Sequence, residues 1–172
     1  MKRKLLLFGL AALLAAPALA APALTPFQIG IWGPKVQIFP EQTKVMGLRL
    51  NLARSDNQDV LGLDFGLVSK AERMDAIQLN LANLVGGEFT GVAVGLFNQM
   101  GSVAGLQAGL FNNAAHDMTG FQFGLFNVAD DAAGFQIGLI NRTVSLRGLQ
   151  IGLVNLNADG PVTFFPFLNA SF

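Results

Sequence analysis

The feature that most constrains the fold is an eight-residue pattern, Gly-x-Gln-x-Gly-Leu-x-Asn, that recurs every 14 or 15 residues. Repetition at such a fixed period is typical of repeat architectures, in which one small unit stacks on the next to form a continuous core. The copies, here called octets, begin at Gly47, Gly62, Ala76, Gly91, Gly105, Gly120, Gly134 and Gly148. Six- or seven-residue spacers that carry most of the charged residues separate them.

Within each octet, apolar residues occupy positions two, four and six, and this alternation predicts a half-buried β-strand. We expect these three positions to point inward and form the core. Position three is usually glutamine and position eight asparagine, and amides stacked coil upon coil can hydrogen-bond along the stack. Asparagine also tolerates left-handed backbone, which would suit a corner. The predicted ladders are Gln107, Gln122, Gln136 and Gln150, and Asn98, Asn112, Asn127, Asn141 and Asn155.

Two all-β folds can accommodate the repeat. In a β-solenoid, each repeat is one coil, and about eight 14–15-residue coils with atypical end caps would make a rod of roughly 40 Å. In a small outer-membrane β-barrel, each repeat is one strand and the leucines would face lipid. We favour the solenoid, because antiparallel strands would place successive asparagine corners on opposite sides of a membrane. Nothing would then explain why these corners share one residue.

The chain divides into four segments. Residues 1–20 have the basic start, the short apolar run and the small residues before a cleavage site of a secretory signal peptide. Residues 21–46 form a leading capping segment, 47–161 the β repeat domain, and 162–172 a terminal capping strand. The last segment resembles a ninth octet, with Pro166 in the second glycine position.

Composition narrows the function classes. Loss of the leader lowers the basic residues from 11 to 8 against 11 acidic residues, so the mature chain carries a net charge of −3. This balance argues against nucleic-acid binding. The absence of cysteine excludes disulfides and thiol chemistry. We expect a protein exported to the cell surface or outer membrane, or otherwise to the periplasm.

No combination of residues in the sequence indicates an enzyme, a cofactor or a metal site. His116 has no second histidine or cysteine with which to share a metal. Asp130 and Asp131 lack the glycine-spaced carboxylates of a calcium loop and are expected in a solvated turn. We predict instead an apolar stripe at position seven and no small-molecule substrate. Either the spacers fold over this stripe, because large exposed apolar patches are uncommon, or it could bind a second copy, an envelope protein or the membrane surface. The stripe is Phe97, Phe111, Phe126, Ile140 and Val154.

The motifs together resemble those of bacterial surface-repeat-containing proteins. They are the octet, Val36-Gln-Ile-Phe-Pro40, Met46-Gly-Leu-Arg-Leu50, Val60-Leu-Gly-Leu-Asp-Phe-Gly66 and Phe165-Pro-Phe-Leu-Asn169. The sequence departs from the pattern at Ala93 and Ala108. The resemblance covers nearly all of the mature chain and implies an exported surface protein, without supplying catalytic or ligand residues. The expected function is an exported, non-catalytic structural or interaction protein. An integral outer-membrane pore or anchor is the alternative, and an envelope enzyme comes third.

Overall fold

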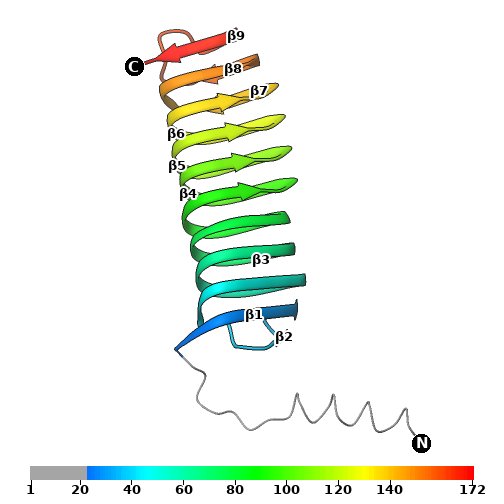
Figure 1. The fold of residues 1–172 in the computed structure, drawn as a ribbon. Helices are drawn as coiled ribbons and strands as arrows, with labels where there is room; N and C mark the ends of the chain where they lie inside the picture. Colours follow the sequence, from blue (N-terminus) through cyan, green and yellow to red (C-terminus); the bar gives the residue numbers. More distant parts are fainter. Residues whose placement is uncertain (1–22) are drawn as a thin grey trace, which may run out of the picture.

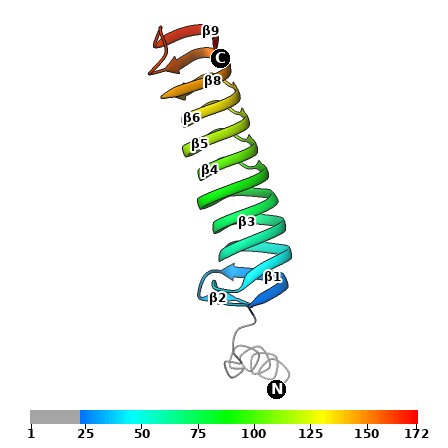
Figure 2. The ribbon, with the colours of Figure 1, turned by 90° about the vertical axis from the view of Figure 1, so that its left-hand side faces the viewer.

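A computed structural model describes residues 23–172, which form a rod of stacked β coils, a β-solenoid (Figure 1). Viewed from the side, the coils lie one above another along the whole rod (Figure 2). The predicted signal peptide lies outside the described residues. The strands are β1 (Leu24–Trp32), β2 (Val36–Gln37), β3 (Lys44–Val94), β4 (Phe97–Ala108), β5 (Phe111–Phe123), β6 (Phe126–Ile137), β7 (Ile140–Thr143), β8 (Ser145–Asn157) and β9 (Phe164–Ser171).

Consecutive coils pair in parallel, and each octet position pairs with the same position in the next octet. Gly105 of β4, for example, pairs with Gly120 of β5, which pairs with Gly134 of β6. The change between 14- and 15-residue spacing occurs in the spacers, where the register between β4 and β5 shifts after Met100. The parallel pairing is that of the predicted solenoid and differs from the antiparallel pairing that the barrel alternative required.

The prediction that positions two, four and six form the core is wrong. Leu110 at position six is 42% exposed and Phe121 at position two is 44% exposed, whereas Gln122 at position three is fully buried. Alternation along a strand shows only that two sets of side chains lie on opposite faces. The parallel stacking decides which set points inward, because amides inside the coil can bond to one another with no competition from water. The solenoid is therefore polar along part of its interior and apolar on much of its exterior.

Two amide ladders run along the interior. In the glutamine ladder, each Nε2 donates to the Oε1 of the preceding coil, from Gln122 to Gln107 at 2.6 Å and from Gln150 to Gln136 at 2.7 Å. In the asparagine ladder, each Nδ2 donates to the Oδ1 of the following coil, as between Asn112 and the next asparagine at 2.8 Å. Each bond satisfies buried donors and acceptors that would otherwise destabilise the fold.

The asparagines do not adopt the left-handed backbone that we expected at a corner. They lie in strands, and Asn112 Nδ2 also donates to the carbonyl of Phe123 in the next coil at 2.8 Å, just before that coil bends. Positive φ angles occur instead at the first glycine of each octet that begins with one, as at Gly120, where φ is 124°. A Cβ at Gly120 would lie 2.2 Å from the carbonyl oxygen of Gly105, so the close stacking of this column also requires glycine.

The apolar part of the core comes from the spacers. One buried row lies two residues before each octet and another lies two residues after position eight. The first row is Val45, Val60, Met74, Phe89, Val103, Met118, Ala132 and Leu146, and the second includes Ala71, Val85, Met100, Ala114 and Ala129. Each coil thus contributes amides on one side of the interior and small or flexible apolar side chains on the other.

Strands cap both ends of the rod. β2 pairs antiparallel with β1 at the start, and β9 pairs antiparallel with β8 at the end. The last strand, which resembles a ninth octet in sequence, runs antiparallel to the coil before it. The reversal aligns Asn169 with Gln150, and Asn169 Nδ2 donates to Gln150 Oε1 at 3.0 Å. The terminal asparagine therefore closes the glutamine ladder.

Candidate interaction surface

The outer surface is apolar on both sides of a bend that recurs just before β4, β5, β6 and β7. β4 ends at Ala108, the chain bends at Gly109 and Leu110, and β5 begins at Phe111. We call this bend the Gly-Leu corner. Its leucines project outward, and Leu96, Leu110, Leu125 and Leu139 are each more than 40% exposed. Leu153, at the same octet position within the continuous strand β8, is exposed as well.

The predicted stripe at position seven lies immediately after this corner. Phe97 and Phe111 are exposed, and Phe126, Ile140 and Val154 are half-buried. The phenyl rings stack along the rod, with centroids 5.1 Å apart for Phe97 and Phe111 and 4.8 Å for Phe111 and Phe126. Phe97 and Phe111 are therefore not covered by a spacer.

A second aromatic column lies before the corner, at positions two and four. Phe121 stacks on Phe135 with a centroid distance of 5.1 Å and lies beside Phe123 at 6.1 Å. The sequence reasoning missed this column because it assigned these residues to the core. The signal that could have found it is the polar character of position three in all octets but one, because buried glutamines need hydrogen-bond partners at the same position of the neighbouring coils.

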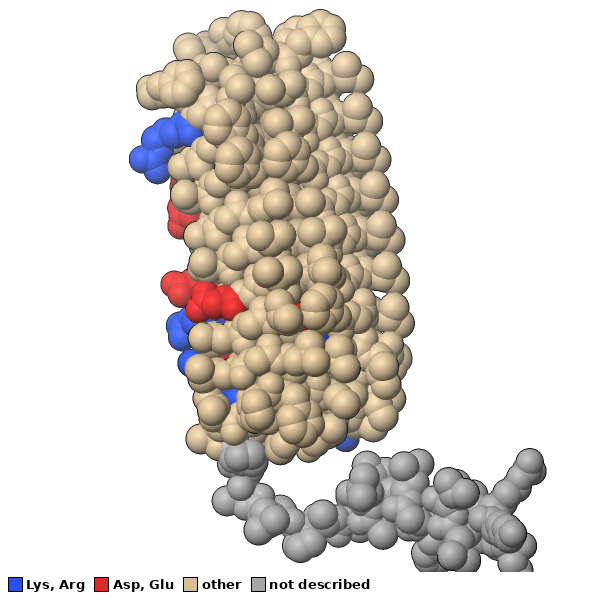
Figure 3. Space-filling model, viewed as in Figure 1, with Lys and Arg blue, Asp and Glu red and all other residues tan. Residues whose placement is uncertain are grey.

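Charge is segregated from this apolar surface. From Gly62 to Asn155, the octets contain one charged residue, Asp64, and its side chain is buried. The remaining charges of that range lie in the spacers. The spacers are about half a coil from the Gly-Leu corner: His116, for example, follows Gly109 by seven residues. In the view of Figure 3, most of the charged side chains lie along one edge of the rod, and most of the remaining visible face is uncharged. We call the edge that the charged spacers form the spacer edge.

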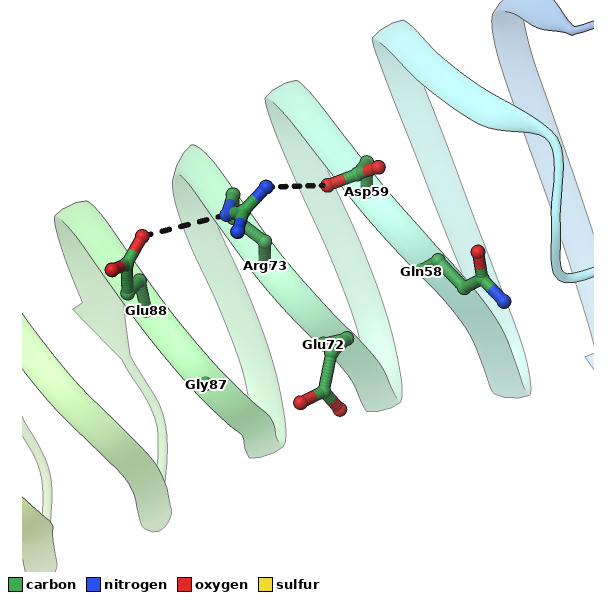
Figure 4. A pocket seen from close by; sticks show the side chains of 6 residues that line it. All are labelled: Gln58, Asp59, Glu72, Arg73, Gly87 and Glu88. Atoms are coloured by element: carbon green, nitrogen blue, oxygen red, sulfur yellow. Dashed lines mark ion pairs between the residues drawn. The ribbon is translucent and has the colours of Figure 1, made fainter.

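The spacer edge contains a shallow hollow between successive coils (Figure 4). Arg73 lies between Asp59 and Glu88, with nitrogen–oxygen distances of 3.8 and 3.4 Å, and Glu72 lies nearby. These side chains are well exposed, and ion pairs of this kind contribute little to stability. Within residues 23–172, no three His, Cys, Asp or Glu side chains are grouped as a metal site would require.

His116, Asp130 and Asp131 are exposed in the spacers. His116 lies in the lining of a second open depression with Lys70 and Gln99. The structure does not bring it together with Asp130 or Asp131 in that depression. Residues 23–172 also contain no helix with the length and apolarity needed to cross a membrane.

The interior holds one ionic cluster that the sequence reasoning missed. Arg49 and Asp64 occupy position three, where later octets have glutamine, and both side chains are fully buried. The Nε of Arg49 donates to Asp64 Oδ1 at 2.8 Å, and Asn51 and Asn80 also donate to the Asp64 carboxylate. The signal for this cluster was a basic and an acidic residue at consecutive glutamine positions.

The burial and hydrogen bonds of this cluster indicate a structural role. Burial raises the pKa of Asp64, but the nearby Arg49 charge and the hydrogen bonds from Arg49, Ser69 and Asn51 outweigh it, so the net pKa is below the ordinary value. Arg49 also donates to the carbonyl of Lys70, in the second spacer after its own octet. The group therefore ties the first coils of β3 together, and both of its charged side chains are fully buried.

The glutamine ladder is interrupted in the coils that follow this cluster along the chain. Gln78 donates to Asp64 and Ser69, but its Oε1 has no hydrogen-bond partner among the described residues. The next position three along the chain holds Ala93, which has no amide to donate. This is one of the two departures from the repeat, and it separates the ionic cluster from the ladder that begins at Gln107.

No protein-family model, no curated protein and no solved structure matches the chain. The assignment of a function therefore rests on the surface and interior of this chain alone.

Proposed function

We propose that this protein is an exported, non-catalytic structural or interaction module at the bacterial cell surface, and that it works through the apolar surface around its Gly-Leu corner. The observation that carries the proposal is the continuous exposure of leucine and phenylalanine on an ordered scaffold. Monomeric proteins rarely expose large contiguous apolar patches, and such patches mark interaction sites. The signal-peptide pattern and the resemblance to surface-repeat proteins support the location.

The solenoid suits this role because its backbone is fixed by pairing on both sides of each inner coil. Position seven of one coil is held directly beside position seven of the next, as Phe111 is beside Phe97 and Phe126. A partner therefore meets a preorganised surface and orders few side chains on binding, which lowers the entropic cost of association.

Partition of the full chain into the detergent phase of Triton X-114 tests whether the apolar surface is accessible to a partner. The wild type should enter the detergent phase, and Phe111→Ser with Phe126→Ser should move it toward the aqueous phase with an unchanged circular dichroism spectrum. Asp130→Ser with Asp131→Ser, on the spacer edge, is the matched control and should partition as the wild type does. A wild type that stays aqueous and monomeric would refute the proposal.

A further inference from the structure

The apolar surface wraps around a convex corner. Phe123 precedes the bend, Leu125 lies on it and Phe126 follows it, and all three side chains reach the surface of the same coil. A second copy or another folded protein that packs on one side of such a corner leaves the other side in water. A fluid apolar phase covers both sides at once.

The surface also offers few hydrogen-bonding groups. Strand backbones pair with the coils above and below, and the bend is paired as well: Leu110 N donates to Leu96 O at 3.0 Å and Leu139 N to Leu125 O at 3.0 Å. The amide side chains of positions three and eight point inward. Protein interfaces usually contain about one hydrogen bond per 100–200 Å², whereas hydrocarbon demands that backbone groups be satisfied internally. This outer surface meets the second requirement.

The charged spacer edge lies about half a coil from the Gly-Leu corner. With the corner in an apolar phase, the acidic and basic side chains of the spacers would stay in water, as in amphipathic elements that lie in a membrane interface. The described residues carry eight basic and eleven acidic side chains, a net charge of −3. Attraction to anionic lipid is therefore absent, and the hydrophobic effect must supply the binding.

We propose that the rod binds the surface of a lipid bilayer, with the Gly-Leu corner among the acyl chains and the spacer edge toward water. This inference rests on the proposed function and names its partner as a neutral lipid surface. Binding should be as strong to phosphatidylcholine vesicles as to vesicles that contain phosphatidylglycerol. It should also persist in about 1 M salt, where charges are screened beyond about 3 Å.

Trp32 provides a natural probe of this contact. It is the single tryptophan of the sequence, its side chain is 66% exposed, and it lies at the end of β1, which pairs with the first octet of β3. In the pairing of β1 with β3 it lies opposite Arg54, at position eight of the first octet, and the turn at residues 33–35 follows it directly. On addition of phosphatidylcholine vesicles to the full chain, its emission should shift to shorter wavelength, and lipids brominated on the acyl chains should quench it.

Two triple variants locate the contact. The corner variant is Leu110→Gln, Leu125→Gln and Leu139→Gln. Its vesicle partition coefficient should fall at least about tenfold, because each replacement removes apolar contact with the lipid acyl chains. The edge variant replaces apolar spacer residues in the same way and should bind as the wild type does: Ala115→Gln, Val144→Gln and Ala158→Gln. All three proteins carry the same residues 1–22, and a peptide of that segment measured alone gives its own contribution to binding.

The possible outcomes distinguish failure of the lipid-binding inference from failure of the proposed interaction function. Vesicle binding that the corner variant loses, with circular dichroism unchanged in all three proteins, supports the lipid surface. A chain that ignores vesicles but forms a discrete dimer, dissolved by the corner variant, overturns the lipid partner and leaves the interaction function in place. Binding confined to anionic vesicles and released by salt also overturns it. A chain that binds neither vesicles, detergent nor a second copy refutes both proposals.

Discussion

Replacement of Asp64 by asparagine should destabilise the solenoid far more than the same replacement at Asp56. Asp64 is fully buried and pairs with the fully buried Arg49, so Asp64→Asn leaves a guanidinium in the interior without its counter-charge. Removal of one partner from a buried ion pair costs about 3–5 kcal/mol. Asp56 is only 10% exposed, but its partner Arg54 is 40% exposed, so water still solvates the guanidinium that Asp56→Asn leaves without its counter-charge, and the loss costs about 0–1 kcal/mol.

Urea unfolding followed by far-ultraviolet circular dichroism measures this difference. With an m value of about 2 kcal/mol/M, the urea midpoint of Asp64→Asn should fall by roughly 1.5–2.5 M. The midpoint of Asp56→Asn should fall by less than about 0.5 M. Because each coil contacts only its neighbours, the loss can also take the form of an early transition of the first coils. Equal curves for the two variants would refute the reasoning from burial.

A double variant, Arg49→Gln with Asp64→Gln, tests what the ion pair itself contributes. It places at both positions the residue that later octets use there, next to Gln78, which already donates to Asp64. Replacement of a whole buried ion pair is often neutral or stabilising. The double variant should therefore recover most of the stability that Asp64→Asn loses. A double variant no more stable than Asp64→Asn would show that the cluster supplies net stability that amides cannot replace.

Three further predictions concern pH, the glycine column and the glutamine ladder. Because the folded pKa of Asp64 is lowered, its contribution is complete above the ordinary carboxyl pKa of about 3.9 and is lost as the pH falls through the folded value. The urea midpoint of the wild type should thus fall toward that of Asp64→Asn below about pH 4, and a constant gap would contradict this. Gly120→Ala should cost roughly 2–6 kcal/mol from positive φ and the carbonyl contact. Gly86→Ala, which meets only the flexible carboxylate of Glu72, should leave the melting temperature almost unchanged. Gln122→Leu should cost about 1–3 kcal/mol for each of the two ladder neighbours it leaves with an unpaired amide atom, and wild-type stability in thermal melts would argue against the ladder.

The repeat alone is enough to predict the fold class. Its constant period, its alternation and the constant asparagine at position eight favour parallel coils. The glutamine and asparagine positions also identify which amides can bond along the axis. The cap at the end is harder to predict, because Phe164 to Asn169 resembles an octet closely enough to suggest the same direction. Its reversal depends on the alignment of Asn169 with Gln150 across the last pair of strands.

The period, the strand positions and the placement of charge in the spacers all follow from the sequence. The face of each strand that points inward does not, and the packing of the coils was needed to decide it. Alternation is symmetric, so Leu110 and Gln107 were equally eligible for the interior. Stacking favours the glutamine, because its amide finds a partner at the same position of the next coil, where Gln122 donates at 2.6 Å. The leucines are left outside, and the same choice that completes the core creates the apolar surface.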